Sequence, residues 1–192
     1  SSQSGFIDSV GFELYSQLLE EAIAKKNGTD KKREKGNAEL LLQIDAYLPD
    51  DYISDERHKI EIYKRIREID SRVNYENLQD ELIDRFGEYP DVVAYLLEIG
   101  LAKSYLDQAF VKSVERQQNA VIIHFEKISQ QLYLTQDYFE ALSMTNLKAR
   151  IGEKNGLIEV IFDVKNKKDY EILEGLVNFG EKMLEIKQRK AE

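Results

Sequence analysis

The chain has 192 residues, a formal net charge of −9 and a hydrophobic fraction of 42%. This length and composition are enough for one sizeable core, or for one domain with an appendage. The absence of cysteine excludes disulfides, thiolate metal ligands and a cysteine nucleophile. The sequence has no membrane-length apolar run and no signal pattern, so we expect a cytoplasmic protein without a membrane partner.

The first 37 residues predict a helical appendage followed by a tether. From Ser9 to about Lys26, apolar residues recur at intervals of three and four, as on one face of an amphipathic helix. The stretch from Lys25 to Lys35 is rich in basic residues and contains no apolar one. We therefore predict an appendage over residues 1–26, a basic linker over 27–37 and a folded domain over 38–192.

The next part of the chain predicts one strand and then a layer of helices. Residues 38–45 partly alternate between apolar and polar, as in a strand. Three successive helices follow, predicted over residues 54–70, 75–86 and 90–105. We expect Ser54 and Asn74 to cap the first two, and Gly87 to end the second.

The second half changes to a strand-like period. Two pairs of strands are predicted, over 110–114 with 120–125 and over 147–151 with 157–164. A short helix capped by Thr135 and a closing helix capped by Asn166 complete the pattern. The predicted fold class is therefore α+β: a layer of three consecutive helices plus a small, mainly antiparallel sheet, with an N-terminal helical appendage.

The sequence contains few motifs that are typical of an enzyme. It contains neither of the glycine-rich phosphate-binding patterns and no Gly-x-Ser-x-Gly elbow. Its two histidines, His58 and His124, do not have the spacing of zinc ligands. We expect no catalytic residue, no metal and no cofactor. A hydrolase that uses some of the 36 acidic residues stays open as an alternative.

A basic segment opens an alternative of another class. Lys31, Lys32 and Arg33 lie in the Lys25–Lys35 stretch, which a stand-alone nucleic-acid-binding module would use. A solvated linker is favoured, because no aromatic residue interleaves the cations and the rest of the chain is acidic. We expect no tight direct binding of nucleic acid by this chain.

The predicted helix at 75–86 has a charged flank. Its inward stripe is formed by Tyr75, Leu78, Leu82 and Phe86. Glu81, Asp84 and Arg85 fall together outside that stripe. Glu81 and Arg85 are four residues apart, so mutual support within the helix is the simpler interpretation, and a patch that docks another protein is the alternative.

Three groups of residues carry a resemblance to a known family. Glu81–Gly87 (ELIDRFG) followed by Pro90, and Leu48–Ile53 (LPDDYI) followed by Arg57 and Tyr63-Lys64-Arg65, resemble motifs of the C-terminal domain of bacterial transcription-repair coupling factors. Upstream, residues 3–7 (QSGFI) and 10–15 (VGFELY) resemble the end of the translocation module that these proteins share with the RecG branch-migration helicases. The three groups also occur in the family's order.

The resemblance implies a regulatory role within a longer, ATP-driven translocase of double-stranded DNA. Residues 1–26 would be the tail of its second helicase lobe, and the rest a non-catalytic terminal domain. That domain would dock on the parent's N-terminal module, which resembles the excision-repair B subunit, through Glu81, Asp84 and Arg85. Docking would mask recruitment of the excision-repair A subunit and restrain the motor, with Lys25 to Gly36 as hinge. RNA polymerase and DNA would be partners only through the parent.

Overall fold

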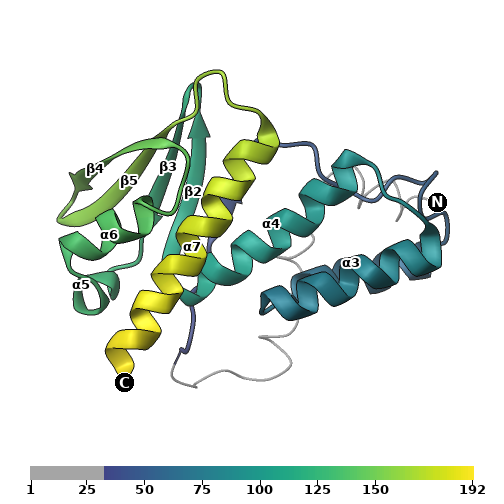
Figure 1. Cartoon of the computed structure of the whole chain (residues 1–192), viewed down its shortest axis with the longest axis horizontal. Helices are drawn as coiled ribbons and strands as arrows, with labels where there is room; N and C mark the ends of the chain where they lie inside the picture. The colour runs from purple at the N-terminus through teal and green to yellow at the C-terminus, as the bar shows by residue number, and fades with distance from the viewer. Residues whose placement is uncertain (1–32) are drawn as a thin grey trace. The chain divides into compact units, whose positions relative to one another are not determined.

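The computed structural model describes residues 33–192, which form two compact units (Figure 1). The first comprises Asp45–Leu101, and the second comprises Glu34–Ile44 together with Ala102–Glu192. Their helices and one mixed sheet confirm the α+β class. The predicted appendage and residues 27–32 of the linker lie outside the described residues, so the boundaries at 26 and 37 stay predictions.

Three successive helices build the first unit, as predicted. They are α2 (Glu56–Arg67), α3 (Arg72–Phe86) and the first part of α4 (Asp91–Gln108), which runs on into the second unit. Gly87 ends α3 with a φ of 85°, a left-handed conformation in which a side chain would be strained. This is the helix end that the sequence predicts.

Both predicted N-caps of these helices are wrong. Asp55, not Ser54, caps α2, because its carboxylate accepts two backbone N–H groups of the first turn and favours the positive end of the helix dipole. Ser71 caps α3, so this helix begins three residues before the predicted Tyr75. Asn74 takes part instead as the third residue of a capping box, accepting hydrogen bonds from the backbone before it.

The core of the first unit draws on one face of each helix. It contains Leu48 and Ile53 from the entering segment, Ile62, Tyr63 and Ile66 from α2, Tyr75, Leu78 and Leu82 from α3, and Val93, Leu96 and Leu97 from α4. The predicted inward stripe of α3 is thus confirmed for three of its four residues. Phe86 is only half buried; its ring lies 6.0 Å from that of Tyr52.

The second unit contains a five-stranded sheet in the order β1-β2-β3-β5-β4. Its strands are β1 (Glu39–Leu41), β2 (Val111–Gln117), β3 (Ala120–Phe125), β4 (Lys148–Lys154) and β5 (Leu157–Asp163). Only β1 with β2 is a parallel pair, so the sheet is mainly antiparallel, and both predicted hairpins are confirmed. β1 is shorter than predicted, since Gln43 has a φ of 57° that a strand cannot contain.

Helices α6 (Thr135–Leu142) and α7 (Asp169–Ala191) cover one face of this sheet (Figure 1). The Phe125 ring of β3 lies 5.0 Å from the ring of Tyr138 on α6 and 6.3 Å from that of Phe179 on α7. The short α5 (Ser129–Leu132) was not predicted. The predicted caps Thr135 and Asn166 are wrong: Thr135 is the first residue of α6, and Lys168 occupies the N-cap position of α7, since Asn166 adopts a left-handed φ of 60° in the loop before it.

Adjacent residues of α3 provide a test of this packing. Leu82 is fully buried, whereas Ile83 is 46% exposed. We expect Leu82→Ala to lower the free energy of unfolding by about 2–5 kcal/mol, because it leaves a cavity in the core. Ile83→Ala, the matched control, is expected to change it by no more than about 0.5 kcal/mol. Urea unfolding of both variants measures the difference, and equal effects would contradict this orientation of α3.

Candidate functional site

The structure separates the three predicted docking residues. Glu81 and Arg85 lie beside the buried stripe of α3, and their side chains form an ion pair of 3.0 Å. Asp84 is exposed on the outward side of the helix. The i, i+4 support expected from the sequence therefore exists, but it includes only two of the three residues.

Glu81 and Arg85 belong to a network that joins α3 to α2. The Arg85 guanidinium donates from Nη1 to Glu61 Oε1 at 2.9 Å and from Nη2 to Glu61 Oε2 at 3.3 Å, a bidentate contact. Its Nη1 also donates to Glu81 Oε2, which in addition accepts from Arg65 Nη1. Four side chains from two helices thus form one chain of alternating charge.

The sequence analysis missed the partners on α2, although a signal was present. Both helices carry the spacing Glu-x-x-x-Arg, as Glu61 with Arg65 and as Glu81 with Arg85. When two such helices pack antiparallel, each glutamate meets the arginine of the other helix. The crossed pairs Glu61–Arg85 and Glu81–Arg65 are this arrangement.

The network shifts the titration of its members. Hydrogen bonds from Arg85 lower the pKa of Glu61, and those from Arg65 and then Arg85 lower the pKa of Glu81. Both glutamates in turn raise the pKa of Arg85. Glu61, Glu81 and Arg85 are therefore charged at neutral pH. Because about a third or more of each side chain is exposed, each pair contributes only about 0.2–1 kcal/mol to stability.

Asp84 differs from its neighbours because it has no ion-pair or hydrogen-bond partner within residues 33–192. Next to it on the outer side of α3 is the exposed Ile83, and three turns earlier the helix exposes Val73 (68%). Asp80 is exposed on the same side. This outer side of α3, which we call the α3 flank, thus offers carboxylates and apolar groups that the unit itself does not use.

The family-like segments 48–53 and 63–65 lie behind α3, on the side opposite to the α3 flank. The Tyr52 hydroxyl lies 2.8 Å from the carbonyl of Gly87 and 3.2 Å from that of Leu82. The Tyr63 hydroxyl accepts the backbone N–H of Leu48 at 3.0 Å. Segment 48–53 therefore contacts both Tyr63 and the end of α3 through these hydrogen bonds. Asp84 forms none of them.

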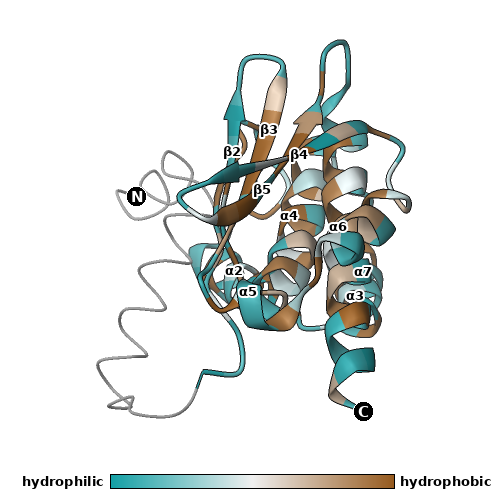
Figure 2. Cartoon of the chain, turned by 90° about the vertical axis from the view of Figure 1, so that its left-hand side faces the viewer, coloured by the Kyte–Doolittle hydropathy of each residue, from teal (hydrophilic) through white to brown (hydrophobic). Residues whose placement is uncertain are grey.

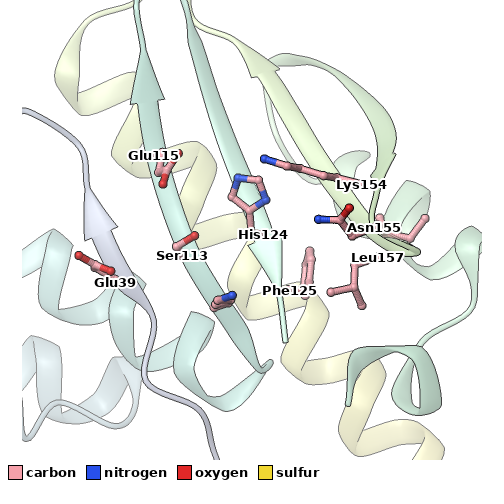
Figure 3. Close-up of a pocket in the computed structure, with 10 residues that line it drawn as sticks. Glu39, Ser113, Glu115, His124, Phe125, Lys154, Asn155 and Leu157 are labelled. Atoms are coloured by element: carbon pink, nitrogen blue, oxygen red, sulfur yellow. The ribbon is translucent and has the colours of Figure 1, made fainter. Parts of the chain in front are cut away.

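A second candidate lies on the polar face of the sheet in the other unit. A hollow of about 380 Å³ is lined by residues that include Ser113, Glu115, His124 and Lys154 (Figure 3). Ser113, His124 and Glu159 occupy paired positions on β2, β3 and β5, and His124 Nδ1 lies 3.5 Å from Glu159 Oε2. No hydrogen bond links Ser113 to His124 in the described part of the chain. Ser113 and His124 thus do not form the hydrogen bond that joins a serine nucleophile to its base.

Metal binding, membrane insertion and the basic segment are the remaining expectations from the sequence. Across residues 33–192, no group of three histidine or acidic side chains is placed to hold a metal ion. In the same range, no helix is long and apolar enough to cross a membrane. Most of the basic Lys25–Lys35 segment lies outside the described residues.

Comparison with known proteins assigns the family. A family model described as the TRCF domain matches residues 42–135. A crystal structure of the C-terminal domain of a transcription-repair coupling factor matches with a TM-score of 0.81 and 74% sequence identity, over 82% of this chain and 98% of that one. The chain belongs to the transcription-repair coupling factor family. The resemblance drawn from its motifs is thereby confirmed.

Full-length members of the family show how much of such a protein the chain represents. The transcription-repair-coupling factor of Bacillus subtilis (strain 168) is 33% identical over 189 residues, which are 98% of this chain and 16% of that protein. One from Staphylococcus epidermidis is 35% identical over 186 residues, again 16% of its length. The chain thus corresponds to the C-terminal part of a transcription-repair coupling factor.

The crossed ion pairs yield a prediction for titration. In Arg85→Ala, Glu61 loses its arginine partner and Glu81 keeps only Arg65, so we expect the pKa of Glu61 to rise towards the ordinary glutamate value and that of Glu81 to rise less. Carboxyl chemical shifts followed by NMR from pH 2 to 7 measure both values. Since the pKa values are lowered in the folded state, the stability that the pairs add is complete above the ordinary value and is lost as the pH falls below it. An unchanged titration of Glu61 would show that the bidentate contact is absent in solution.

Proposed function

We propose that this chain is a non-catalytic, autoinhibitory interaction domain of its parent transcription-repair coupling factor. It docks through the α3 flank on the parent's N-terminal module, which resembles the excision-repair B subunit. In the docked state it masks the surface that recruits the excision-repair A subunit. It also restrains the ATP-driven translocase that removes stalled RNA polymerase from DNA. RNA polymerase, DNA and the A subunit are thus partners of the parent.

The observation that carries the proposal is the outward carboxylate of Asp84, unpartnered within residues 33–192, beside an exposed Ile83. A carboxylate in this position is able to accept a charge-assisted, bidentate hydrogen bond from an arginine of another surface. The exposed isoleucine adds apolar area to the same contact. Within the ELIDRFG motif, these two residues are the ones that contribute least to the fold.

The charge of the surrounding unit supports a basic partner. Between residues 45 and 101 there are 15 acidic and seven basic residues, so this unit carries nearly all of the chain's net negative charge. Such a field accelerates encounter with a positively charged surface and disfavours acidic competitors. The proposal therefore requires a docking surface rich in arginine or lysine on the N-terminal module.

Glu81 and Arg85 have two roles under this proposal. Their network with α2 helps to fix the orientation of α3 and hence the direction of Asp84. Both also retain capacity for the partner, because an arginine has five N–H donors and a carboxylate accepts about four hydrogen bonds, more than the contacts they make within the unit. Docking can therefore add contacts to the network without dismantling it.

Substituting the carboxylate of Asp84 tests the proposal in the full-length parent protein. We expect Asp84→Asn to leave the melting temperature of the present chain unchanged, since this side chain bonds to nothing else within the described residues. Removing one interfacial charged hydrogen bond costs about 2 kcal/mol, which is about a thirtyfold shift of the docking equilibrium. In the full-length protein this should raise basal ATPase activity and increase capture of the excision-repair A subunit.

The matched control removes a charge elsewhere on the same unit. Glu68 is exposed at the far end of α2, and Glu68→Gln changes the net charge by the same amount. Both readouts should stay at the wild-type level in this variant. Equal behaviour of Asp84→Asn, Asp84→Lys and Glu68→Gln in both assays would defeat the assignment. Glu81→Ala is a less clean variant, because it also deprives Arg65 and Arg85 of a partner.

A further inference from the structure

The second unit has a different charge character from the first. Residues 34–44 and 102–192 contain 16 acidic and 15 basic residues, so this unit is nearly neutral. Several of its cations are held by carboxylates: Lys103 by Asp107, Arg116 by Asp169, Arg189 by Glu140 and Lys190 by Asp137. Others have no carboxylate partner in the described part of the chain, and five of these gather at one end of the sheet.

We define this basic end by Lys148, Arg150, Lys165, Lys167 and Lys168. Lys148 and Arg150 lie two residues apart on β4 and therefore on the same face of the sheet. The three other lysines belong to the loop between β5 and α7. Within residues 33–192, none of the five side chains has an ion-pair partner.

Backbone pairing brings these segments together. Lys148 is the partner of Asp163 in the β4–β5 ladder, so the loop that follows Asp163 starts beside it. The Val164 N–H donates to the Asn119 carbonyl at 2.8 Å, which places the β2–β3 turn next to the same loop. Figure 1 shows this turn and the loop into α7 at the same end of the sheet. A hollow of about 500 Å³, lined among others by Gln118, Lys148 and Arg150, lies there.

Nearby carboxylates offset the basic end only in part, because none of them forms an ion pair with its five cations. Asp163 Oδ1 accepts the backbone N–H of Lys165 at 3.0 Å. Asp169 pairs with Arg116 at 3.3 Å. Glu171 accepts the backbone N–H of Lys168 at 2.7 Å and so caps α7. Asp163 and Glu171 keep their negative charge, but the five cations outnumber them, so the basic end has a positive balance and is able to attract an anion from outside the unit.

Protection of an open sheet edge explains only part of this cluster. β4 is the last strand of the sheet and consists mostly of hydrophilic residues, in contrast to the apolar β3 and β5 (Figure 2). Lysines on such an edge oppose unwanted pairing with other strands. That reason covers Lys148 and Arg150, but not the three lysines of the loop or the amide side chains of Gln117, Gln118 and Asn119, which line the same hollow.

We propose that the basic end contacts the phosphate backbone of double-stranded DNA. Closely spaced cations flanked by amide donors are suited to phosphate oxygens, which accept hydrogen bonds from lysine, arginine, glutamine and asparagine. A duplex has one negative charge per about 1.7 Å, so it presents several phosphates to closely spaced cations at once. The contact reads no sequence, is weak and depends strongly on salt. It is separate from the Lys25–Lys35 segment and does not depend on the docking of α3.

Fluorescence anisotropy of the whole chain with a labelled 20-base-pair duplex tests this surface. The wild type should bind at 30 mM salt and lose most of its affinity by 150 mM. Lys165→Ala/Lys167→Ala/Lys168→Ala should weaken binding at least about tenfold at 30 mM salt. The same variant should reduce the slope of log affinity against log salt by about one for each phosphate that it no longer neutralises. Lys148→Ala/Arg150→Ala should act in the same direction.

Matched variants assign the effect to the basic end. Lys64→Ala/Lys127→Ala removes two exposed lysines from other places and should change neither affinity nor slope. Lys31→Ala/Lys32→Ala should likewise have little effect, and loss of binding in this variant instead would overturn the proposal in favour of the N-terminal segment. Circular dichroism of each variant verifies folding.

Other results would also overturn the proposal. One is the absence of measurable duplex binding at 30 mM salt. Another is tighter binding of a single strand that depends on Tyr170, an exposed ring beside Lys167, because this would indicate base stacking. A third is salt-sensitive self-association of the chain, abolished by the same lysine variants, which would show that the basic end meets the acidic unit of a second copy.

Discussion

Helices α2 and α3 have the same Glu-x-x-x-Arg spacing, and the glutamate of each forms an ion pair with the arginine of the other. The candidate docking surface of this protein depends on these crossed ion pairs. Arg85 donates hydrogen bonds to Glu61 from both terminal nitrogens and a further one to Glu81, which also accepts from Arg65. None of these partly exposed pairs stabilises the fold by much. The energy that holds α3 in its rotation about its axis comes mainly from the fully buried Leu82 and its neighbours, and the crossed charges add to it. A rotation by one residue would bring Asp84 towards α2 and bury the flank, so the core packing and the network together determine which side chains face a partner.

The two units divide the electrostatic properties of the chain between them. A net charge of −9, taken as a property of the whole, suggests a protein that avoids polyanions. That average conceals an acidic helical unit with 15 acids against seven bases and a nearly neutral sheet unit with a cluster of cations at one end. A domain built in this way is suited to two kinds of partner at once: an arginine-rich protein surface for the helices and a phosphate backbone for the sheet. Whole-chain net charge does not describe a local surface, because charges act over about one Debye length, roughly 8–10 Å, rather than over the molecule.

Sequence periodicity was sufficient for the elements, and it failed where side chains compete locally. The three helices, both hairpins and the closing helix follow from the spacing of apolar residues, and Gly87 ends α3 as expected. The caps were misplaced because Ser54 and Asp55, or Ser71 and Asn74, are adjacent or nearby candidates with similar propensities, and only the backbone conformation selects between them. The site was predicted as three equivalent residues, but contact with α2 divides it into a structural pair and an outward carboxylate. That division depends on which helix packs against α3, and the periodicity of α3 alone does not reveal it.

Under the docking proposed here, a small flank is sufficient because the partner belongs to the same chain. A flexible tether gives effective concentrations in the millimolar range, so a contact with a dissociation constant of about 0.1 mM would already be closed in roughly nine of ten molecules. Opening such a contact costs only about 1.4 kcal/mol for each tenfold change in population. A large apolar interface would be too stable for nucleotide or polymerase binding elsewhere in the parent to overcome. A surface of one outward carboxylate, one exposed isoleucine and a neighbouring charge network has the modest strength that reversible control requires. The rigidity of α3 is then as important as its charges. If the flank were mobile, the entropy lost by ordering it on docking would cancel most of the small binding free energy that so few contacts provide.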